Sequence, residues 1–336
     1  MQRILIIRLT AMGDVAMTSP VLSAACRQYP NVQFDVLSEP FFEPFFEPLP
    51  NLHFIGTNIR KSGEGVRGLW KLYRKLSCNN YDLVLDLHDV LRTKVLRIFL
   101  SKISGIKTYV IDKGRREKSA LIIDNGKPKH QLKPTIQRYC DVFAKAGFSI
   151  ALSGAYMPPM HSPIDPDKHK NKLWVGVSPF AQHAGKVYPL NKMKEVVRQL
   201  AAKGVDVFVF GGGQKEKQIA EEWEAEIDGC QSVIGKMKLK DEMGLMSNID
   251  CMVSMDSSAM HICSLFGTRV VSVWGATHHY AGFLGYQQKE SDIVSINLPC
   301  RPCSIYGNKP CKYADYRCFD IAPETIVERV LSVNMA

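Results

Sequence analysis

The stretch from Ile249 to Gly275 constrains the fold most strongly, because it reads as a strand, a helix and a second strand in direct succession. One apolar run ends at Asp256-Ser257-Ser258, a helical segment follows, and a second apolar run ends at Gly275. Asp256, Ser257 and Ser258 then stand where a strand meets the exposed N–H groups of a helix N-terminus. Such a junction favours the binding of a phosphorylated ligand.

Apolar, strand-like runs alternate with helical patterns along the whole chain, which is typical of an α/β protein with parallel sheets. In the first half we predict strands at 3–8, 33–37, 52–55, 83–86 and 108–111, and helices at 15–28, 68–76, 91–102 and 135–146. In the second half we predict strands at 174–178, 205–210, 232–234, 251–254 and 270–273, and helices at 192–203, 216–227, 240–247 and 260–266. The simplest architecture is a pair of doubly wound, Rossmann-like domains facing across a cleft.

The boundary between these domains is predicted in residues 151–172, which carry four prolines and show no periodicity. We therefore expect an N-terminal domain over 1–155, a linker over 156–172, a C-terminal domain over 173–321 and a final helix over 322–336.

Charge is distributed unevenly between the two halves. Residues 1–150 contain 23 lysines and arginines against 13 aspartates and glutamates, whereas residues 151–336 contain 20 of each. Solvated lysines on helices would explain the single residues but not the asymmetry. A field of this kind attracts an acidic substrate, an anionic membrane face or a nucleic acid. No RNA-binding module or aromatic-basic motif is present, so nucleic acid is the least favoured of these partners.

The chain has no run of 18 apolar residues, which argues against a transmembrane helix. Its start, MQRILIIRLT, resembles a buried first strand rather than a signal peptide. We therefore expect a cytoplasmic protein.

Four of the ten cysteines lie within one short segment, at Cys300, Cys303, Cys311 and Cys318. Four thiols at this spacing could form a structural zinc site or hold an iron–sulfur cluster. The alternatives are reduced thiols or air-formed disulfides, because the second pair departs from a CxxC spacing. The other six cysteines are scattered and are expected to behave as small apolar residues.

The first strand-to-helix junction contains Thr10, Gly13 and Asp14. Gly13 permits a close turn of the backbone, and Asp14 stands where a helix would begin. Asp14 could simply cap that helix. Alternatively, it lies at the carboxyl edge of the sheet and takes a proton from an acceptor hydroxyl. No GxGxxG fingerprint is present, which disfavours a dehydrogenase.

Further candidates follow strands of the second half. Lys186 lies in a loop after the strand that ends at Ser178, and a lysine there can neutralise a departing diphosphate. Gly212 and Glu216 could approach a ribose, although an ordinary turn with an acidic first helical turn explains them equally well. Met237 could lie against an adenine ring or belong to the core.

His261 follows Asp256-Ser257-Ser258 on the same helix. On its own it would be interpreted as a buried core histidine. A single N-cap residue, however, does not explain three polar residues together with this histidine.

In combination, these segments resemble the lipopolysaccharide heptosyltransferases of glycosyltransferase family 9. RLTAMGDVAMTSPVLSA is similar to the N-terminal signature of that family, and SMDSSAMHICSLFGTRVVSVWGAT to its donor signature. GKVYP, GGGQKE and GKMKL match between them in order and spacing, so the resemblance spans nearly the whole chain.

The resemblance implies a GT-B fold and an inverting, metal-independent transfer of heptose from ADP-heptose to the inner core of lipopolysaccharide. It implies Asp14 as the general base and Lys186 as the lysine that binds the diphosphate. The donor-binding residues are then expected to be Gly13, Ser178, Gly212, Glu216, Met237, Asp256, Ser257, Ser258 and His261.

The acceptor is expected to be an anionic lipopolysaccharide precursor bound by the basic N-terminal half. Our candidates for this contact are Thr10, Arg60, Lys61, Lys113, Arg115 and Arg116. The protein would then touch the inner face of the cytoplasmic membrane peripherally.

Two other functions stay open. Ala181-Gln182-His183 stands where many family members have hydroxyl residues, and Ser258 where glycine is usual. A different nucleotide-sugar is therefore one alternative. A non-catalytic nucleotide-sugar binding protein is the other, although a binding protein needs no base such as Asp14.

Overall fold

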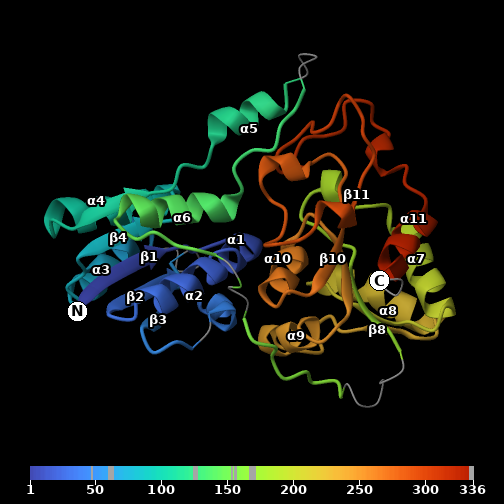
Figure 1. Ribbon diagram of the computed structural model, residues 1–336, viewed down its shortest axis with the longest axis horizontal. Coiled ribbons are helices and arrows are strands. Elements are labelled where there is room, and N and C mark those ends of the chain that lie inside the picture. Colours follow the sequence, from blue (N-terminus) through green and yellow to red (C-terminus); the bar gives the residue numbers. More distant parts are fainter. Residues whose placement is uncertain are drawn as a thin grey trace. The chain divides into compact units, whose positions relative to one another are not determined.

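The computed structural model describes residues 1–46, 48–59, 64–123, 128–152, 154, 157–165 and 172–332. It divides into two compact units, which are described separately (Figure 1). The N-terminal unit comprises Met1–Lys113 and Thr135–Met157, and the C-terminal unit comprises Gly114–Pro134 and Pro158–Ala336.

The N-terminal unit is built on a five-stranded parallel sheet. Its strands are β1 (Gln2–Ile7), β2 (Val32–Ser38), β3 (Leu52–Gly56), β4 (Leu83–Asp86) and β5 (Lys107–Val110), in the order β3-β2-β1-β4-β5. The strands β2 and β3 lie on one side of β1, and β4 and β5 lie on the other. The strand order therefore reverses between β1 and β4, which are parallel neighbours with Ile7 paired to Asp86. In open α/β sheets ligands bind at the carboxyl ends of the strands at such a switch point.

Helices cover both faces of this sheet. They are α1 (Met12–Ala16), α2 (Ser19–Gln28), α3 (Gly65–Ser77), α4 (Leu91–Ile98) and α6 (Thr135–Lys145), with the 3₁₀ helix η1 (Pro40–Phe45) and the π-helix η2 (Phe99–Ile103). Leu5 and Ile7 of β1 join α3, α4 and η2 in one core cluster. Phe34 of β2 packs against Phe143 of α6 instead. Because strand side chains alternate between faces, the apolar strands supply both cores.

The single helix predicted at 15–28 is wrong, because the chain forms α1 and α2 with a break at Met17-Thr18. Pro20 lies in the first turn of α2. It has no N–H to donate to Ala16, and its ring would clash with that carbonyl in a continuous helix. The break separates the short helix that carries Asp14 from the helix that packs in the core.

The C-terminal unit contains a six-stranded parallel sheet. Its strands are β6 (Trp174–Ser178), β7 (Asp206–Val209), β8 (Cys230–Ser232), β9 (Cys251–Met255), β10 (Arg269–Val273) and β11 (Ile293–Val294), in the order β11-β10-β9-β6-β7-β8. Its helices are α5 (Arg115–Leu121), α7 (Leu190–Ala202), α8 (Gln214–Glu226), α9 (Leu239–Met246), α10 (Ser258–Leu265) and α11 (Pro323–Leu331), with η4 (Ala184–Lys186), η5 (His279–Ala281), η6 (Glu290–Asp292) and η7 (Arg317–Phe319). The switch point falls between β6 and β9, where Ser178 pairs with Ser254.

The predicted final helix corresponds to α11. Ile326, Val327 and Val330 on α11 are buried in the main core cluster of the C-terminal unit, together with residues of α7. The helix is therefore part of that unit rather than a separate appendage, and residues 333–336 lie outside the described part of the chain.

One segment departs from the predicted domain division. Residues 114–134 were assigned to the N-terminal domain but group with the C-terminal unit. Leu121 is buried in a cluster with Ala281 and Ile305, and the N–H of Leu132 donates to the carbonyl of Tyr280 at 2.8 Å. Apolar contacts with residues far away in the sequence decide to which unit this segment belongs, and a local sequence pattern does not reveal such contacts.

Within the described residues, no helix is both long and apolar enough to cross a membrane.

Candidate active site

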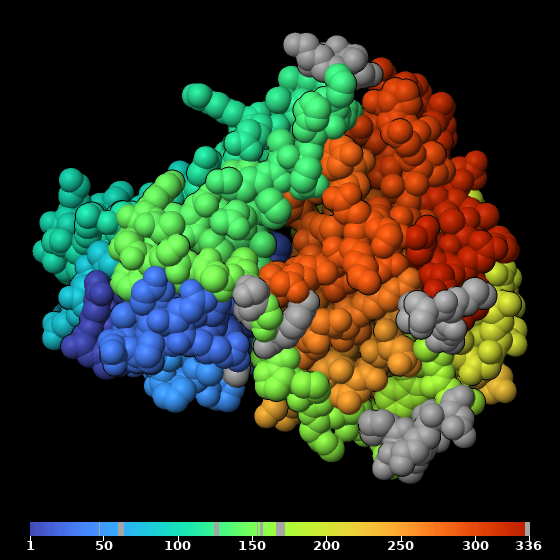
Figure 2. Space-filling model, viewed as in Figure 1, coloured from blue at the N-terminus to red at the C-terminus, as the bar shows by residue number. Residues whose placement is uncertain are grey.

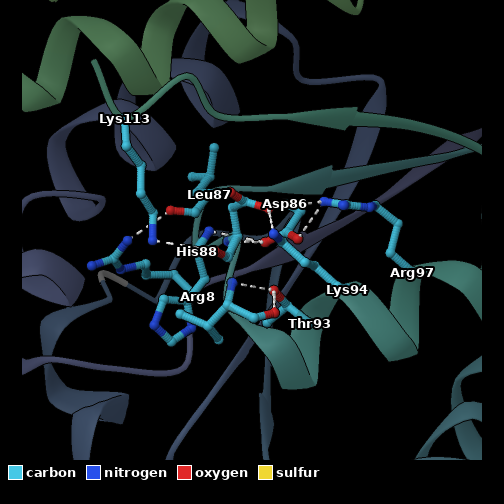
Figure 3. Close-up of polar contacts among 10 residues, drawn as sticks. Arg8, Asp86, Leu87, His88, Thr93, Lys94, Arg97 and Lys113 are labelled. Carbon is cyan, nitrogen blue, oxygen red and sulfur yellow. Dashed lines mark hydrogen bonds and ion pairs between the residues drawn. The ribbon is translucent and has the colours of Figure 1, made fainter. Parts of the chain in front are cut away.

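Arg8 follows β1 directly and organises the switch point of the N-terminal unit (Figure 3). Its guanidinium is buried and donates to the carbonyl of Leu87 at 2.7 Å. It also forms an ion pair of 2.6 Å with the carboxylate of Asp14. Burial alone would lower the pKa of Arg8, but Asp14 together with Tyr139 and Asp86 outweighs burial and the pKa is raised. Arg8 is therefore a permanent buried cation beside Asp14.

Asp86 ends β4 and is fully buried. Its Oδ1 accepts the backbone N–H groups of His88 and Asp89, each at 2.9 Å. Its Oδ2 accepts from Nη1 of Arg97 at 2.9 Å, which ties α4 to the strand end (Figure 3). These contacts fix the loop that carries His88.

His88 is buried beside two cations. Burial, followed by the charges of Arg8 and Lys113, lowers the pKa of His88 to about 3. Its Nδ1 has no hydrogen-bond partner among the described residues. Lys113 extends from the end of β5 and donates to the carbonyl of Asp89 at 3.3 Å (Figure 3). The site thus contains a neutral imidazole, which can donate or accept a hydrogen bond, between positive groups.

Asp14 lies in the first turn of α1, and 34% of its side chain is exposed. The hydroxyl of Tyr139 donates to the backbone carbonyl of Asp14 at 3.2 Å, which anchors α1 from α6. The carboxylate is therefore held by Arg8 on one side and reaches solvent on the other. An accessible, fixed carboxylate is suited to accepting a proton.

The corresponding site of the C-terminal unit centres on Lys186, the last residue of η4. Its ammonium lies 2.8 Å from Oδ2 of Asp256, which directly follows β9. The contact is an ion pair without hydrogen-bond alignment, since that oxygen has no hydrogen-bond partner in the part of the chain that the structure describes. Both side chains are largely buried. The sequence predicted both residues as site residues, and the structure brings them together.

Close backbone contacts hold Lys186 in place. A Cβ on Gly307 would lie 2.6 Å from Cγ of Lys186, and a Cβ on Gly185 would lie 2.8 Å from the carbonyl of Gly307. The N–H of Ala276 donates to the carbonyl of Gly185 at 2.9 Å. Larger residues at either glycine would therefore displace the lysine.

Arg301 fixes the loop that supports this lysine. Its buried guanidinium donates to the carbonyls of Trp274, Gly275, Thr277 and Ile296. This one side chain joins the loop after β10 to the cysteine-rich segment.

The N-terminus of α10 lies beside the ion pair. Ser257 occupies the N-cap position, and its hydroxyl is 3.2 Å from that of Ser254. Ser258 begins the helix, and His261 is buried in its first turn. At the first turn of α8, the carboxylate of Glu216 accepts the N–H of Gly212 at 2.7 Å, which agrees with the alternative of an ordinary turn with an acidic first helical turn. Met237 is only half-buried.

The predicted site residues divide between the two units. Ser178, Gly212, Glu216, Met237, Asp256, Ser257, Ser258 and His261 lie in the C-terminal unit with Lys186, whereas Thr10, Gly13, Asp14 and Lys113 lie in the N-terminal unit. Arg115 and Arg116 are exposed on α5 and belong to the C-terminal unit. Arg60 and Lys61 lie outside the described residues.

The predicted metal site is not supported. In the part of the chain that the structure describes, no three His, Cys, Asp or Glu side chains are arranged to hold a metal ion. The ten cysteines, all of which the structure describes, form no disulfide. Burial raises the pKa of Cys318 to about 11 and also raises that of Cys303, which disfavours the thiolate that a metal requires. Cys318 packs in the main apolar core of the C-terminal unit, whereas the thiol of Cys303 lies 3.7 Å from the carbonyl of Ala276.

Arg8, Asp86, His88 and Arg97 were not predicted as site residues. The signal that could have identified two of them is a charged residue at the end of an apolar strand, at Arg8 and at Asp86. Arg97 could not be identified in this way, because it lies in the last turn of α4, where basic residues are common.

Comparison with known proteins gives one consistent result. A family model described as glycosyltransferase family 9 (heptosyltransferase) matches residues 69–314. Lipopolysaccharide heptosyltransferase 1 of Pseudomonas aeruginosa is 24% identical, covering 96% of this chain and 92% of the relative. Lipooligosaccharide heptosyltransferase 2 of Campylobacter jejuni is 22% identical, covering 97% of both.

Solved structures support the fold. A family 9 glycosyl transferase from Veillonella parvula has a TM-score of 0.73 at 17% identity, covering 98% of both chains. The Escherichia coli ADP-heptose LPS heptosyltransferase II has a TM-score of 0.68 at 18% identity, covering 99% of this chain and 98% of that one. The likeness confirms the predicted α/β architecture of two Rossmann-like units, the GT-B fold.

Proposed function

Because this chain belongs to glycosyltransferase family 9, the heptosyltransferases, we propose that it transfers heptose from ADP-heptose to the inner core of a lipopolysaccharide precursor. The observation that carries the proposal is the buried pair of Lys186 and Asp256 at the N-terminus of α10. A cation beside a helix N-terminus favours a diphosphate.

In the proposed reaction Lys186 and the N–H groups of α10 neutralise the charge that develops on the departing ADP. Asp256 holds Lys186 in position in the absence of the donor. Ser257 and Ser258 contribute hydroxyl groups to the same phosphate-binding turn. Protein groups alone supply this charge, so we expect transfer to continue in the presence of EDTA.

Asp14 is proposed as the general base. The acceptor hydroxyl gives its proton to the Asp14 carboxylate, its oxygen forms a bond to the anomeric carbon, and the bond from that carbon to the diphosphate breaks. A single displacement inverts the configuration of the sugar. Arg8 keeps Asp14 ionised before the acceptor binds, because a neighbouring cation favours a carboxylate over its acid.

The proposed acceptor is a lipid-linked, acidic glycan bearing 3-deoxy-octulosonic acid or heptose. The N-terminal unit contains 17 lysines and arginines against 11 aspartates and glutamates, a net charge of +6. Arg8, Lys113 and the neutral His88 offer hydrogen-bond donors to carboxylate and hydroxyl groups. We also propose cytoplasmic location with peripheral membrane contact, since such an acceptor is embedded in a membrane.

The donor is supported by the solved relatives. One of them is the E. coli heptosyltransferase WaaC with ADP-2-deoxy-2-fluoro heptose, which has a TM-score of 0.66 at 20% identity. The substitution of hydroxyl residues by Ala181-Gln182-His183 favours a second candidate, a transferase that uses another nucleotide-sugar.

A thermal-shift screen of nucleoside diphosphates and their sugars, followed by a transfer assay, separates these functions. Selective stabilisation by ADP and ADP-heptose with product formation is expected. Stabilisation by UDP- or GDP-sugars would favour the second candidate. Binding without any transfer to a lipopolysaccharide acceptor would indicate a non-catalytic binding protein.

A further inference from the structure

Two neighbouring helical segments of the N-terminal unit expose apolar side chains together with cations. Ten large apolar side chains are exposed among the described residues, and five of them lie on α3, α4 and η2: Val66, Trp70, Leu91, Ile98 and Ile103. Leu91 is 77% exposed and Trp70 is 42% exposed. Side chains of this kind on one surface mark an interaction site.

The segments form one continuous surface, which we call the α3–α4 surface and define as residues 65–77 and 91–103. The ring of Trp70 lies edge-on to that of Phe99 with centroids 5.3 Å apart. The hydroxyls of Tyr73 and Ser104 are 3.0 Å apart, which joins α3 to the end of η2. In Figure 2, where residues near 100 are teal, teal atoms lie on the visible surface of the N-terminal unit.

The surface is also strongly cationic. It contains eight lysines and arginines and no aspartate or glutamate. Three of these cations pair with acidic residues outside the surface: Lys71 with Glu64, Lys94 with Asp89, and Arg97 with Asp86. The other five form no ion pair with any described residue: Arg67, Arg74, Lys75, Arg92 and Lys102.

We propose that the α3–α4 surface docks on an anionic lipid bilayer. Exposed aliphatic groups and a tryptophan can enter the interface while lysines and arginines bind lipid phosphates. A nucleic acid would match the cations but gain nothing from Leu91, Ile98 and Ile103. A second copy of the chain would place the same cations opposite one another in a symmetric pair.

The surface also adjoins the proposed acceptor site. Helix α4 begins directly after the Asp86–Val90 loop, and Arg97 on α4 binds Asp86. A bilayer bound at α4 would therefore bring lipid head groups near Arg8 and Asp14. This purpose rests on the proposed function, but lipid binding itself can be measured without donor or acceptor.

Tryptophan fluorescence provides a specific probe. Of the four tryptophans, Trp174, Trp223 and Trp274 are buried in the C-terminal unit and only Trp70 is exposed. On vesicles of phosphatidylethanolamine with phosphatidylglycerol, we expect co-sedimentation, a blue shift of emission and quenching by brominated lipid. Vesicles of phosphatidylcholine should bind far more weakly, and added salt should release the protein.

Two sets of variants test the two components of the surface. Arg74→Ala/Lys75→Ala/Lys102→Ala should weaken binding roughly a hundredfold, at about fivefold for each charge. Ile98→Ser/Ile103→Ser should weaken it roughly tenfold. Control variants that remove three charges or an exposed apolar side chain elsewhere are Lys145→Ala/Lys203→Ala/Lys240→Ala and Phe41→Ser, which should bind as the unmodified protein does. All variants should retain transfer to a delipidated, water-soluble acceptor.

Several results would overturn the proposal. Equal loss in the controls would indicate non-specific charge attraction, and equal binding to phosphatidylcholine would remove the role of lipid phosphate. Tighter binding to an RNA duplex than to anionic vesicles would identify a nucleic-acid surface. Loss of dimers in Ile98→Ser/Ile103→Ser by light scattering would identify a contact between copies. If vesicle binding behaves as expected but no sugar is transferred, only the proposed function fails.

Discussion

The switch points of the two sheets differ in the charged and polar groups that they present. In the N-terminal unit, two ion pairs of side chains lie at the ends of β1 and β4, Arg8 with Asp14 and Arg97 with Asp86. In the C-terminal unit, the ion pair of Lys186 and Asp256 stands at the N-terminus of a helix. We therefore propose that the same topology serves two kinds of ligand.

The difference follows from what each site is proposed to bind. A diphosphate has many oxygens, which the N–H groups of a helix N-terminus and one lysine can satisfy. A carboxylate base needs a fixed position and a controlled charge, which side chains supply. Buried charges are costly unless paired, so removing one partner of a fully buried ion pair costs about 3–5 kcal/mol.

The largest expected effect comes from Asp14→Asn. The amide cannot accept the proton, so kcat should fall roughly 10²- to 10⁴-fold. Binding of ADP-heptose to the C-terminal unit should persist in a thermal-shift assay. Turnover near the normal rate would break the assignment of the base to the N-terminal site.

Lys186→Gln should reduce kcat by roughly 10²- to 10³-fold, because the charge on the departing diphosphate is no longer neutralised. Lys192→Gln is the matched control, since Lys192 pairs with Asp320 at 3.3 Å near the surface. Steady-state kinetics of both variants would decide the matter. Comparable losses in the two would show that Lys186 has no special role.

Arg8→Gln should move the acidic limb of the kcat/KM profile to higher pH by roughly one unit, because loss of the cation favours the protonated form of a carboxylate. Arg3→Gln breaks another arginine–aspartate pair of the same sheet, Arg3 with Asp35 at 2.7 Å, and should leave the profile in place. A purely structural role of Arg8 would lower activity at every pH without moving the limb.

We expect a smaller effect, on the pH dependence of stability, from the buried His88. Its pKa of about 3 in the folded protein lies below the value of 6.5 for an unperturbed histidine. Between these values the unfolded chain binds more protons, so the free energy of unfolding should fall by about 1.4 kcal/mol per unit as pH drops. His88→Gln should flatten this slope in urea-unfolding midpoints measured from pH 7 to 4.

His278 in the C-terminal unit extends this comparison, because burial lowers its pKa to about 3 as well. His278→Gln should flatten the slope by a similar amount. An unchanged slope in both variants would show that neither imidazole is kept neutral by burial.

Much of the fold follows from local patterns. The strands at 83–86 and 174–178 were predicted with their observed bounds, and the other predicted strands lie within a few residues of theirs. Strand residues alternate between apolar and polar, or form continuous apolar runs, according to which faces of the sheet are buried. This pattern can be recognised within each segment alone. The helix at 115–121 was missed, because its charged sequence has no strong apolar face.

The sequence by itself determined the α/β class, the strand-to-helix junctions at Asp14 and Asp256, and Lys186 as a candidate residue. Each of these predictions depends on residues that are close together in the sequence, within one or two helical turns or strands. Only the tertiary structure decided that Lys186 meets Asp256, that Arg8 holds Asp14 and that residues 114–134 belong to the C-terminal unit. It also decided against a metal among Cys300 to Cys318 in the described chain. These outcomes depend on burial and charge shared by segments far apart in sequence, which no local pattern encodes.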